Sequence, residues 1–598
     1  TASEFEYRAD LAQAGKGGGV AAFRVKLPNW TRDAPGFVIS AKLSGSDLHL
    51  PGSPKRFVDA GALRREIEAW HAALNARRQY EAGTDAALSC LTPHAADYLR
   101  RSVLPEAVRK IPPSGWMAIP GAPSAEASEN PFPETAGEEP VDVVVPVYRG
   151  QPETLRCLES LAAAQVSAPY EVTVLIDDSE PEAYQEVIQA ARRHGFTVML
   201  NRRNLGFVRT ANRAFRLHPR RDVVLLNSDT VVHGDWLGRL RRTAYSHPAN
   251  GTVTPFSNNA TILTYPHPDK PAPLPSPQDL AELDTLCERL NGGAAPEVPS
   301  AVGFCMYVRR DCLAEVGLFD ERNWDRGYAE ENDFCLRARA LGWRNVAAPD
   351  VFVGHSGSAS FGAESADLIR KNLARLAQRY PEYEGEVMEF PRRDPLLPWR
   401  RNLDAERLAG DRRPVALHVS GRLEGGSRRN VLELSQALEA EGCSSLLLET
   451  IDGKRVALRA LDDRSFPNLI YSIDGEWQAL VSLLRRLNLS FVHLHHAGHP
   501  ALSRLPRELA TPYYLTAHDY SWVCPQTTLI DESGAYCGEP EVEGCEKCLR
   551  LNGSHPLLAG WFANGEGGVA ELRKASAELA AGACRVICPS RDVLERMR

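Results

Sequence analysis

The sequence predicts an α/β protein with two separate parallel sheets, because strand-like and helix-like patterns alternate in two stretches of the chain. In the first stretch, apolar runs of strand length alternate with segments of helical period; these runs are VDVVVPV, EVTVLID, FTVML and DVVLLNSD. In the second stretch the same alternation involves PVALHVS, SSLLLET, NLIYSI, SFVHLH, PYYLTAH and CRVICPS. This pattern is typical of βαβ units, whose parallel strands are buried on both faces.

Composition limits the class of protein. The 598 residues are 43% hydrophobic and 24% charged with a net charge of -8, which describes a globular chain rather than a disordered or fibrous one. This balance gives no basic footprint, so no nucleic-acid partner is expected. No apolar run approaches the roughly 18 to 20 residues of a membrane helix, so membrane contact is expected to be peripheral at most. Most of the thirteen cysteines stand singly, which favours a cytoplasmic location, with any membrane contact at the inner face.

Changes in composition divide the chain. Residues 1–110 are expected to form a small β piece followed by helices, and residues 111–140, rich in Pro, Gly, Ser and Glu, a linker. The first α/β domain is assigned to residues 141–390 and the second to residues 414–598. Between them, residues 391–413 contain several prolines and many charges, and we expect a second linker there.

Acidic side chains follow the predicted strands of the first domain. Asp177 and Asp178 end one apolar run, and Asn227 and Asp229 end another. Ligands of open parallel sheets bind beyond the carboxyl ends of the strands, although Asp and Asn after a strand also serve as helix N-caps. A third acidic element, within residues 330–333, favours a functional reading, because crowded carboxylates repel one another unless a cation or substrate uses them.

The stretch from Val141 to Gly362 resembles the family 2 glycosyltransferases, which have a GT-A fold. Asn227-Ser228-Asp229 stands at the position of that family's DXD motif, with Asn as its first residue, and Asn204-Leu205-Gly206-Phe207 is similar to the loop facing the nucleotide. The resemblance implies a nucleotide-sugar donor bound by Pro146, Tyr148, Asp177, Asp178, Asn204, Gly206, Phe207, Asn212, Asn227 and Asp229.

The catalytic residues are also implied by the resemblance. Glu330-Glu331-Asn332-Asp333 matches the family's ED-x-D segment, which makes Glu331 the general base with Glu330 and Asp333 beside it. Glu331 stands where Asp is more common, so the base carries an extra methylene. His355 resembles the family's late metal-binding His, and with Asp229 it would hold Mg²⁺ or Mn²⁺, although a single His after a strand is more often structural.

These assignments imply an inverting, metal-dependent glycosyltransferase. A carboxylate must take the proton of the acceptor hydroxyl, and a divalent cation must neutralise the departing nucleoside diphosphate. The expected donor is a UDP, GDP or dTDP sugar, and the expected acceptor is a glycan or lipid-linked glycan. The resemblance points to bacterial surface polysaccharide, either O-antigen or capsule.

The second domain resembles the N-terminal half of a GT-B glycosyltransferase, most closely of family 4. Gly425 and Gly426 are similar to the glycine turn at the start of a helix in that family, and His518 to the His that faces the transferred sugar. The sequence VICPSRDVLERMR resembles the end of this half. Without the C-terminal half that binds most of the nucleotide, this domain is expected to be inactive alone.

Four cysteines gather near the end of the second domain. Cys524, Cys537, Cys545 and Cys548 include a CxxC pair and could hold a structural Zn²⁺. The twelve residues between the first two do not fit a standard zinc ribbon, so free thiols or a disulfide stay open.

Two other functions compete with the transferase. A nucleotidylyltransferase-like enzyme would carry a Gly-rich basic loop after its first strand, whereas this strand is followed by YRGQPE. A non-catalytic glycan-binding or scaffold protein would not need both Asp229 and Glu331.

Overall fold

The computed structural model divides the chain into two units, residues 1–136 and residues 137–598. It describes four short strands in the first unit and then residues 139–598, except 179, 269, 325–326, 328, 358–363, 422–424, 532–533, 563–567 and 597–598. The first unit pairs β1 with β2 and β3 with β4, both antiparallel; these are β1 (Glu4–Glu6), β2 (Ala22–Arg24), β3 (Phe37–Ile39) and β4 (Lys55–Phe57). Short strands are therefore present in the predicted β region, while the helices and nearly all of the linker predicted for residues 62–140 lie outside the described residues.

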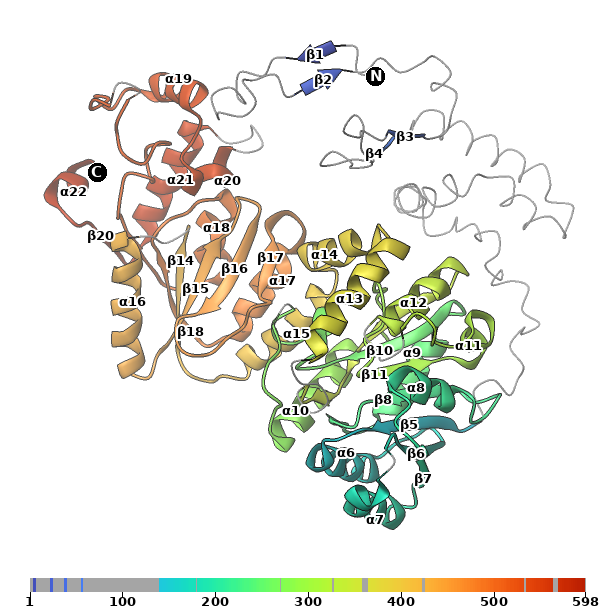
Figure 1. The fold of residues 1–598 in the computed structure, drawn as a ribbon. Coiled ribbons are helices and arrows are strands. Elements are labelled where there is room, and N and C mark those ends of the chain that lie inside the picture. Colours follow the sequence, from blue (N-terminus) through green and yellow to red (C-terminus); the bar gives the residue numbers. More distant parts are fainter. Residues whose placement is uncertain are drawn as a thin grey trace, which may run out of the picture. The chain divides into compact units, whose positions relative to one another are not determined.

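A seven-stranded mixed sheet forms the centre of the first α/β region (Figure 1). Its order is β12-β10-β11-β8-β5-β6-β7, and β11 is antiparallel to both of its neighbours while the other pairs are parallel. The strands are β5 (Val141–Val147), β6 (Tyr170–Ile176), β7 (Thr197–Leu200), β8 (Val223–Leu226), β10 (Asn250–Phe256), β11 (Cys305–Val308) and β12 (Arg344–Phe352). The sequence predicted the first four, which form the parallel part.

Helices cover both faces of this sheet. On one face the core contains residues of α6, α7, α9 and α10, and on the other residues of α8, α11, α12 and α13. The helices are α6 (Gln151–Ala163), α7 (Gln185–Arg193), α8 (Phe207–Phe215), α9 (Trp236–Tyr245), α10 (Pro277–Asn291), α11 (Arg310–Val316), α12 (Glu330–Ala340), α13 (Glu364–Arg379) and α14 (Tyr383–Arg393), with 3₁₀ turns η4 (Pro181–Tyr184) and η5 (Thr261–Leu263).

Alternation along β5 explains the two cores. Val143, Val145 and Val147 contribute to one core and Val144 to the other, because successive side chains of a strand point to opposite faces. All four are fully buried, and each contributes roughly 1.5 to 3 kcal/mol of hydrophobic stabilisation. This rigid sheet positions the polar residues that follow its strands.

A small two-stranded ribbon lies beside the sheet. It pairs β9 (Thr230–Val231) with β13 (Gly354–His355), and the register places His355 opposite Thr230. The end of β8 and the end of β12, more than 120 residues apart in sequence, are thereby joined.

The second α/β region contains another seven-stranded sheet, of order β17-β16-β15-β14-β18-β19-β20 (Figure 1). The five strands from β15 to β20 are parallel, and β16 and β17 add antiparallel strands beside β15. This arrangement is Rossmann-like. The strands are β14 (Val415–Ser420), β15 (Ser444–Thr450), β16 (Arg455–Ala460), β17 (Ile470–Ser472), β18 (Leu489–Leu494), β19 (Tyr513–Thr516) and β20 (Arg585–Ile587).

Helices again cover both faces of the second sheet. Residues of α17, α18, α21 and α22 join its main core, and Val431 of α16 packs with Leu447 on the other face. The helices are α16 (Gly425–Ala440), α17 (Ile473–Arg486), α18 (Pro500–Leu509), α19 (Val542–Asn552), α20 (Ala559–Phe562), α21 (Val569–Gly582) and α22 (Arg591–Arg596), with the 3₁₀ turn η6 (Pro556–Leu558).

The linker predicted for residues 391–413 is largely helical. The end of α14 and the whole of α15 (Leu397–Ala409) occupy it, and α15 places Leu403 in the first core and Leu408 in the second. Among the residues that the structure describes, no helix is long and apolar enough to cross a bilayer.

Candidate functional site

An acid and a histidine face each other where β9 meets β13. Oδ1 of Asp229 lies 3.4 Å from Nε2 of His355, and Oδ2 of Asp229 accepts a hydrogen bond of 2.9 Å from the backbone N–H of Gly357. Asp229 is 6% exposed, so water does not screen the pair strongly. The structure thus brings together the two residues expected to bind the metal.

Three residues that the sequence did not single out fix the His355 ring. Nδ1 of His355 lies 2.7 Å from the carbonyl oxygen of Asn259, and the side chain of Asn258 bonds both the N–H and the carbonyl of His355. The ring of Phe304 stacks on the imidazole with centroids 5.2 Å apart. Asn258 and Asn259 follow β10, so their place after a strand was the available signal.

Burial and the partner charge act in opposite directions on this pair. Burial alone would raise the pKa of Asp229, but the hydrogen bond and charge of His355 lower it below its usual value. For His355, burial acts to lower the pKa, and Asp229 together with the Asn259 carbonyl raises it. Each side chain therefore favours the charged form of the other.

The pair suits a divalent cation. In the neutral tautomer that donates its Nδ1 proton to Asn259, the Nε2 lone pair faces the Asp229 carboxylate, so a cation that takes the place of the Nε2 proton meets two electron-pair donors. Carboxylate oxygen and imidazole nitrogen both bind such ions. In the described part of the chain, no third His, Cys or acidic ligand atom joins them in a close group. A cation here would need further ligands from a bound phosphate or water.

Two neighbouring acids, Glu330 and Glu331, begin α12. Glu330 is 4% exposed, and the outer oxygens Oε2 of Glu330 and Glu331 are both buried without a hydrogen-bond partner. Burial and then the charge of Glu331 raise the pKa of Glu330 well above its usual value. Burial also raises the pKa of Glu331, but backbone hydrogen bonds and the hydrogen bond with Glu330 oppose that rise. The pKa values of both carboxyls are therefore raised, and that of Glu330 is raised more.

The residues before β11 lie between the Asp229–His355 pair and the two acids of α12. The carbonyl of Phe304 accepts a hydrogen bond of 2.8 Å from the N–H of Asn227, and its ring stacks on His355. A Cβ placed on the neighbouring Gly303 would lie 3.8 Å from the Glu331 carboxyl carbon. Gly303 therefore lies near Glu331, and the adjacent Phe304 contacts His355.

Asp333 points to a different set of partners. It is fully buried, and its carboxylate meets Arg337 at 2.9 Å, Arg379 at 3.1 Å and the Tyr380 hydroxyl at 2.8 Å. These contacts tie α12 to α13. The structure favours a bracing role for Asp333, the alternative to a direct catalytic one.

The Asp177 carboxylate organises the loop before α8. Its oxygens accept hydrogen bonds of 2.8 Å from Asn201 and from Leu205 N–H, and of 2.9 Å from Gly206 N–H. Asn204 also accepts from Gly206, at 3.0 Å, and Gly206, with φ 80°, precedes Phe207 at the start of α8. Asp177 therefore fixes the backbone of the loop that is predicted to face the donor.

The other predicted donor residues divide into two groups. Asn212 is buried and bonds the backbone of Phe319 in both directions, which is a structural role. The remaining members, Pro146, Tyr148 and Asn227, are partly exposed at or near the ends of β5 and β8.

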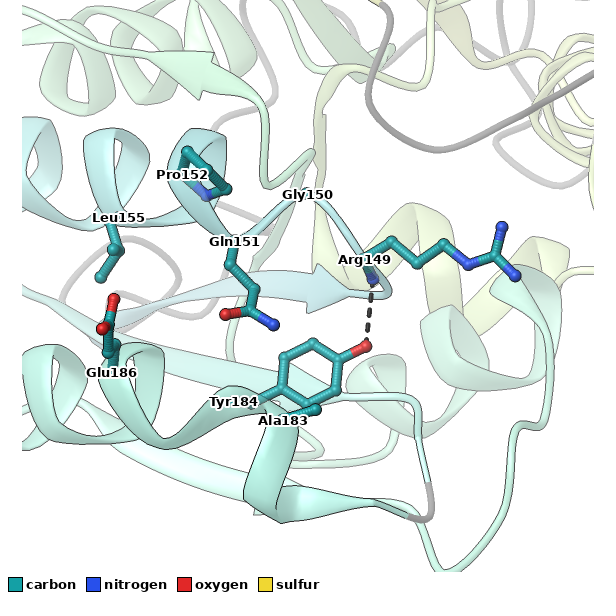
Figure 2. Close-up of a pocket in the computed structure, with 8 residues that line it drawn as sticks. All are labelled: Arg149, Gly150, Gln151, Pro152, Leu155, Ala183, Tyr184 and Glu186. Atoms are coloured by element: carbon teal, nitrogen blue, oxygen red, sulfur yellow. Dashed lines mark hydrogen bonds between the residues drawn. The ribbon is translucent and has the colours of Figure 1, made fainter.

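A concavity of about 690 Å³ adjoins this edge (Figure 2). Arg149, Gly150 and Gln151 after β5 line it together with Tyr184, whose hydroxyl accepts a hydrogen bond from Arg149 N–H and donates one to Asp178. Asp229, His355, Glu330 and Glu331 are not among the residues that line it. Asp178 does not line the concavity and is linked to it through the hydroxyl of Tyr184.

The predicted residues of the second region are only partly brought together. Gly425 and Gly426 begin α16 after β14, and His518 follows β19, where its Nε2 lies 2.9 Å from Nδ1 of His495. The four cysteines are a different case. Cys524, Cys537 and Cys548 lie near enough to Cys545 for their charges to act on the pKa of its thiol, and all four are free thiols. Among the described residues, the group of three potential metal ligands with the closest ligand atoms consists of histidines instead.

Residues 139–376 match the family model described as "Glycosyltransferase like family 2". This stretch is a family 2-like glycosyltransferase domain. The match confirms the resemblance of the first domain, includes Asp229, Glu331 and His355, and ends before the second sheet. No curated protein matches the chain.

Similar solved structures include three transferases bound to nucleotide ligands. GalNAc-T7 with UDP, GalNAc and Mn²⁺ has 15% identity and a TM-score of 0.31, covering 41% of this chain and 49% of that chain, so the match spans about half of its length. A mannosyltransferase from Pyrobaculum calidifontis with GDP-Man and Mn²⁺ has 15% identity and a TM-score of 0.29, covering 50% and 80%. S. aureus TarS 1-349 with UDP-GlcNAc has 17% identity and a TM-score of 0.30, covering 45% and 81%. Values this low transfer no ligand to this chain.

Proposed function

We propose that the family 2-like domain, within residues 141–390, is an inverting glycosyltransferase that moves a sugar from a nucleoside diphosphate to a hydroxyl of a glycan acceptor. The supporting observation is that the short segment before β11 lies beside both the Asp229–His355 pair, through Phe304, and the Glu330–Glu331 pair, through Gly303. Glycosyl transfer needs both, since charge develops on the leaving diphosphate while the acceptor loses a proton. A glycan-binding scaffold has no use for the second pair.

Glu331 is the proposed general base. Its neighbour Glu330 has the more strongly raised pKa, so Glu331 is the acid of the two that ionises at lower pH and can accept a proton from an acceptor hydroxyl. Direct displacement assisted by this carboxylate inverts the anomeric centre. Glu330 is then a positioning residue that stabilises the Glu331 charge, and Asp333 holds α12 in place through Arg337 and Arg379.

Asp229 and His355 are the proposed protein ligands of Mg²⁺ or Mn²⁺. When bound, this cation supplies positive charge that stabilises the departing diphosphate. The Asn258 and Asn259 contacts keep His355 oriented towards Asp229. The loop held by Asp177, together with Asn227 and the end of β5, borders the proposed donor site.

The second α/β region is proposed to be the N-terminal half of a GT-B fold. Its Rossmann-like sheet, the glycines that open α16 and the position of His518 after β19 support this assignment. A cytoplasmic role in the assembly of bacterial surface polysaccharide remains our proposal for the whole chain.

Turnover of a donor panel tests the proposed reaction. Nucleotide release is measured from UDP, GDP and dTDP sugars with Mn²⁺, with water or an added glycan as acceptor. We expect the native chain to turn over one donor class, Asp229→Ala and Glu331→Gln to lose this activity, and Glu159→Gln, an exposed acid on α6, to keep it. Turnover that survives in both site variants would contradict the assignment.

A further inference from the structure

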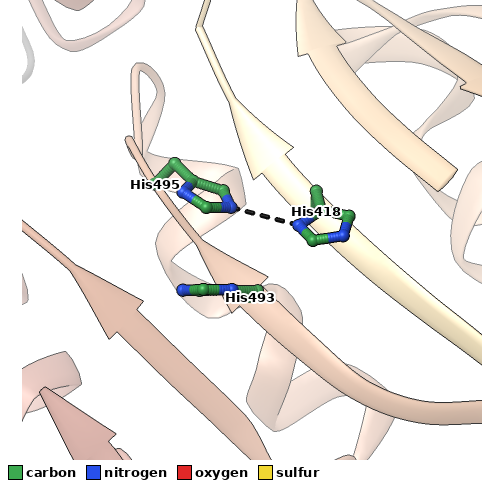
Figure 3. Close-up of side chains that lie close together, drawn as sticks. All are labelled: His418, His493 and His495. Atoms are coloured by element: carbon green, nitrogen blue, oxygen red, sulfur yellow. Dashed lines mark hydrogen bonds between the residues drawn. The ribbon is translucent and has the colours of Figure 1, made fainter. Parts of the chain in front are cut away.

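Histidines gather at the carboxyl edge of the second sheet (Figure 3). His418 of β14 lies beside His493 of β18 in the parallel register, and His495 follows the end of β18. Their exposed fractions are 0%, 5% and 0%. Three imidazoles from two neighbouring strands are thus enclosed where a parallel sheet usually places its ligand.

The three rings are close enough to share one ion. One ring nitrogen from each lies within 4.8 Å of the others. Nδ1 of His418 and Nε2 of His495 are 3.1 Å apart, and the centroids of His493 and His495 are 4.1 Å apart. Two imidazole nitrogens on a tetrahedral zinc ion, each about 2.0 to 2.1 Å from the metal, are separated by about 3.3 Å. The contact between His418 and His495 is close to this separation, and the other ring nitrogens, which lie within 4.8 Å of one another, would move closer together on binding.

Hydrogen bonding within the cluster leaves one ring nitrogen unsatisfied. A neutral imidazole has one donor and one acceptor, and His418, His495 and His518 form a chain through contacts of 3.1 and 2.9 Å. In either direction of donation, the chain ends at Nε2 of His418, which is buried and has no partner. A metal ion bound through Nε2 of His418 would satisfy this atom, whereas an ion bound through Nδ1 would replace the hydrogen bond to His495.

The surroundings favour the ligand form of these side chains. His418 and His493 are buried, which disfavours their protonated forms, and neutral imidazole is the form that binds a metal. Thr516 contacts Nε2 of His493 at 2.8 Å, which orients the ring in the way that outer partners orient zinc ligands. His518 and Asp519 are only partly buried and offer a route from solvent.

We propose that His418, His493 and His495 bind one zinc ion at the carboxyl edge of the second sheet. Neutral imidazole is a ligand preferred by Zn²⁺, and three protein ligands leave a fourth position for water or an exogenous group. This site is separate from the Asp229–His355 pair and does not depend on the proposed transferase activity.

Zinc titration of the full chain tests the site. The metal-free protein is titrated with Zn²⁺ by calorimetry, with excess Mg²⁺ present to occupy hard-cation sites. We expect one tightly bound equivalent, at least about 100-fold weaker binding in His418→Ala and His493→Ala, and unchanged binding in His194→Ala, an exposed histidine. Absence of a tight equivalent in the native chain, or its retention in both cluster variants, would overturn the proposal.

Spectroscopy on the native chain separates this site from the cysteines and does not depend on the folding of any variant. With Co²⁺ in place of Zn²⁺, a histidine site gives visible d–d bands without the near-ultraviolet charge-transfer bands of thiolate ligands. X-ray absorption of the zinc form is expected to show nitrogen and oxygen ligands only. Sulfur ligands, or loss of the equivalent in a Cys545→Ser, Cys548→Ser double variant, would assign the zinc to the cysteines and overturn the proposal.

Discussion

The two sheets of this chain deliver different side chains to equivalent places. Beyond the end of β8, the first sheet presents Asp229, which faces His355, and α12 adds Glu330 and Glu331, whose Oε2 oxygens are buried. Beyond β14 and β18, the second sheet presents a cluster of buried imidazoles with no carboxylate among its three closest members. The parallel backbone is common to both, so the chemistry depends on the residues that follow each strand.

The difference predicts different ligands. Carboxylate oxygens suit hard cations with phosphate and can accept protons from a hydroxyl, whereas neutral imidazoles suit zinc and related metals. Removing the charges of the acidic edge should therefore abolish transfer activity, while zinc binding by the histidine cluster should not change. The following predictions use that contrast.

The largest effect is expected for Asp229→Asn. Loss of the carboxylate facing His355 removes several kcal/mol of charge stabilisation, so transfer should fall by about 10⁴-fold in steady-state assays with Mn²⁺. Asp463→Asn, an exposed acid of the second region, is the matched control and should keep full activity. A comparable loss in the control would show that the effect is not specific to the acidic edge.

Glu331→Gln should reduce kcat by about 10²- to 10⁴-fold because the amide cannot accept the acceptor proton. Donor binding should be retained, since the change does not touch Asp229 or His355. Equilibrium titration with nucleoside diphosphate and Mn²⁺ checks the second part. If Glu331→Gln lost donor affinity while keeping kcat, it would belong to the donor site instead.

Asn258→Ala should weaken the binding of Mn²⁺ by about 10- to 100-fold. The reason is that the Asn258 side chain holds both the N–H and the carbonyl of His355. The concentration of Mn²⁺ at half-maximal activity measures this effect, with kcat at saturating Mn²⁺ little changed. An unchanged Mn²⁺ dependence would remove His355 from the proposed ligand set.

Glu330→Leu should shift the pH profile. Activity requires ionised Glu331, whose pKa burial already raises, so kcat/KM is expected to rise with pH through a pKa above the usual Glu value. Without the hydrogen bond from Glu330 the charged form of Glu331 is less stable, and the acidic limb should move up by about one to two pH units. Glu330→Gln, which can still donate, should move it less, and a downward shift in Glu330→Leu would reverse the assigned order of ionisation.

Much of the acidic edge was predictable because its residues follow apolar strands in sequence order. Asp229 directly precedes β9, Glu331 lies in the first turn of α12, and His355 ends β13. The roles of Asp177 and Asp333 were less predictable. Their partners, Leu205 and Gly206 for one and Arg379 for the other, are set by how loops and helices pack rather than by spacing.

Long-range packing also explains what the sequence could not show. The prolines and charges of residues 391–413 predicted a linker, yet Arg400 and Asp404 of α15 are buried by partners more than 60 residues away, Ile262 and Asn468. The histidine cluster was equally hidden. His493 and His495 are two residues apart in sequence, but His418 joins them only because β14 pairs with β18.

The most direct test is calorimetric binding of UDP and GDP to the full chain with and without Mn²⁺, repeated with Asp229→Asn. If the acidic edge is a metal-dependent nucleotide-sugar site, one nucleotide should bind only when Mn²⁺ is present, and the substitution should abolish that binding. Binding that needs no metal, or that persists in Asp229→Asn, would contradict the proposed site.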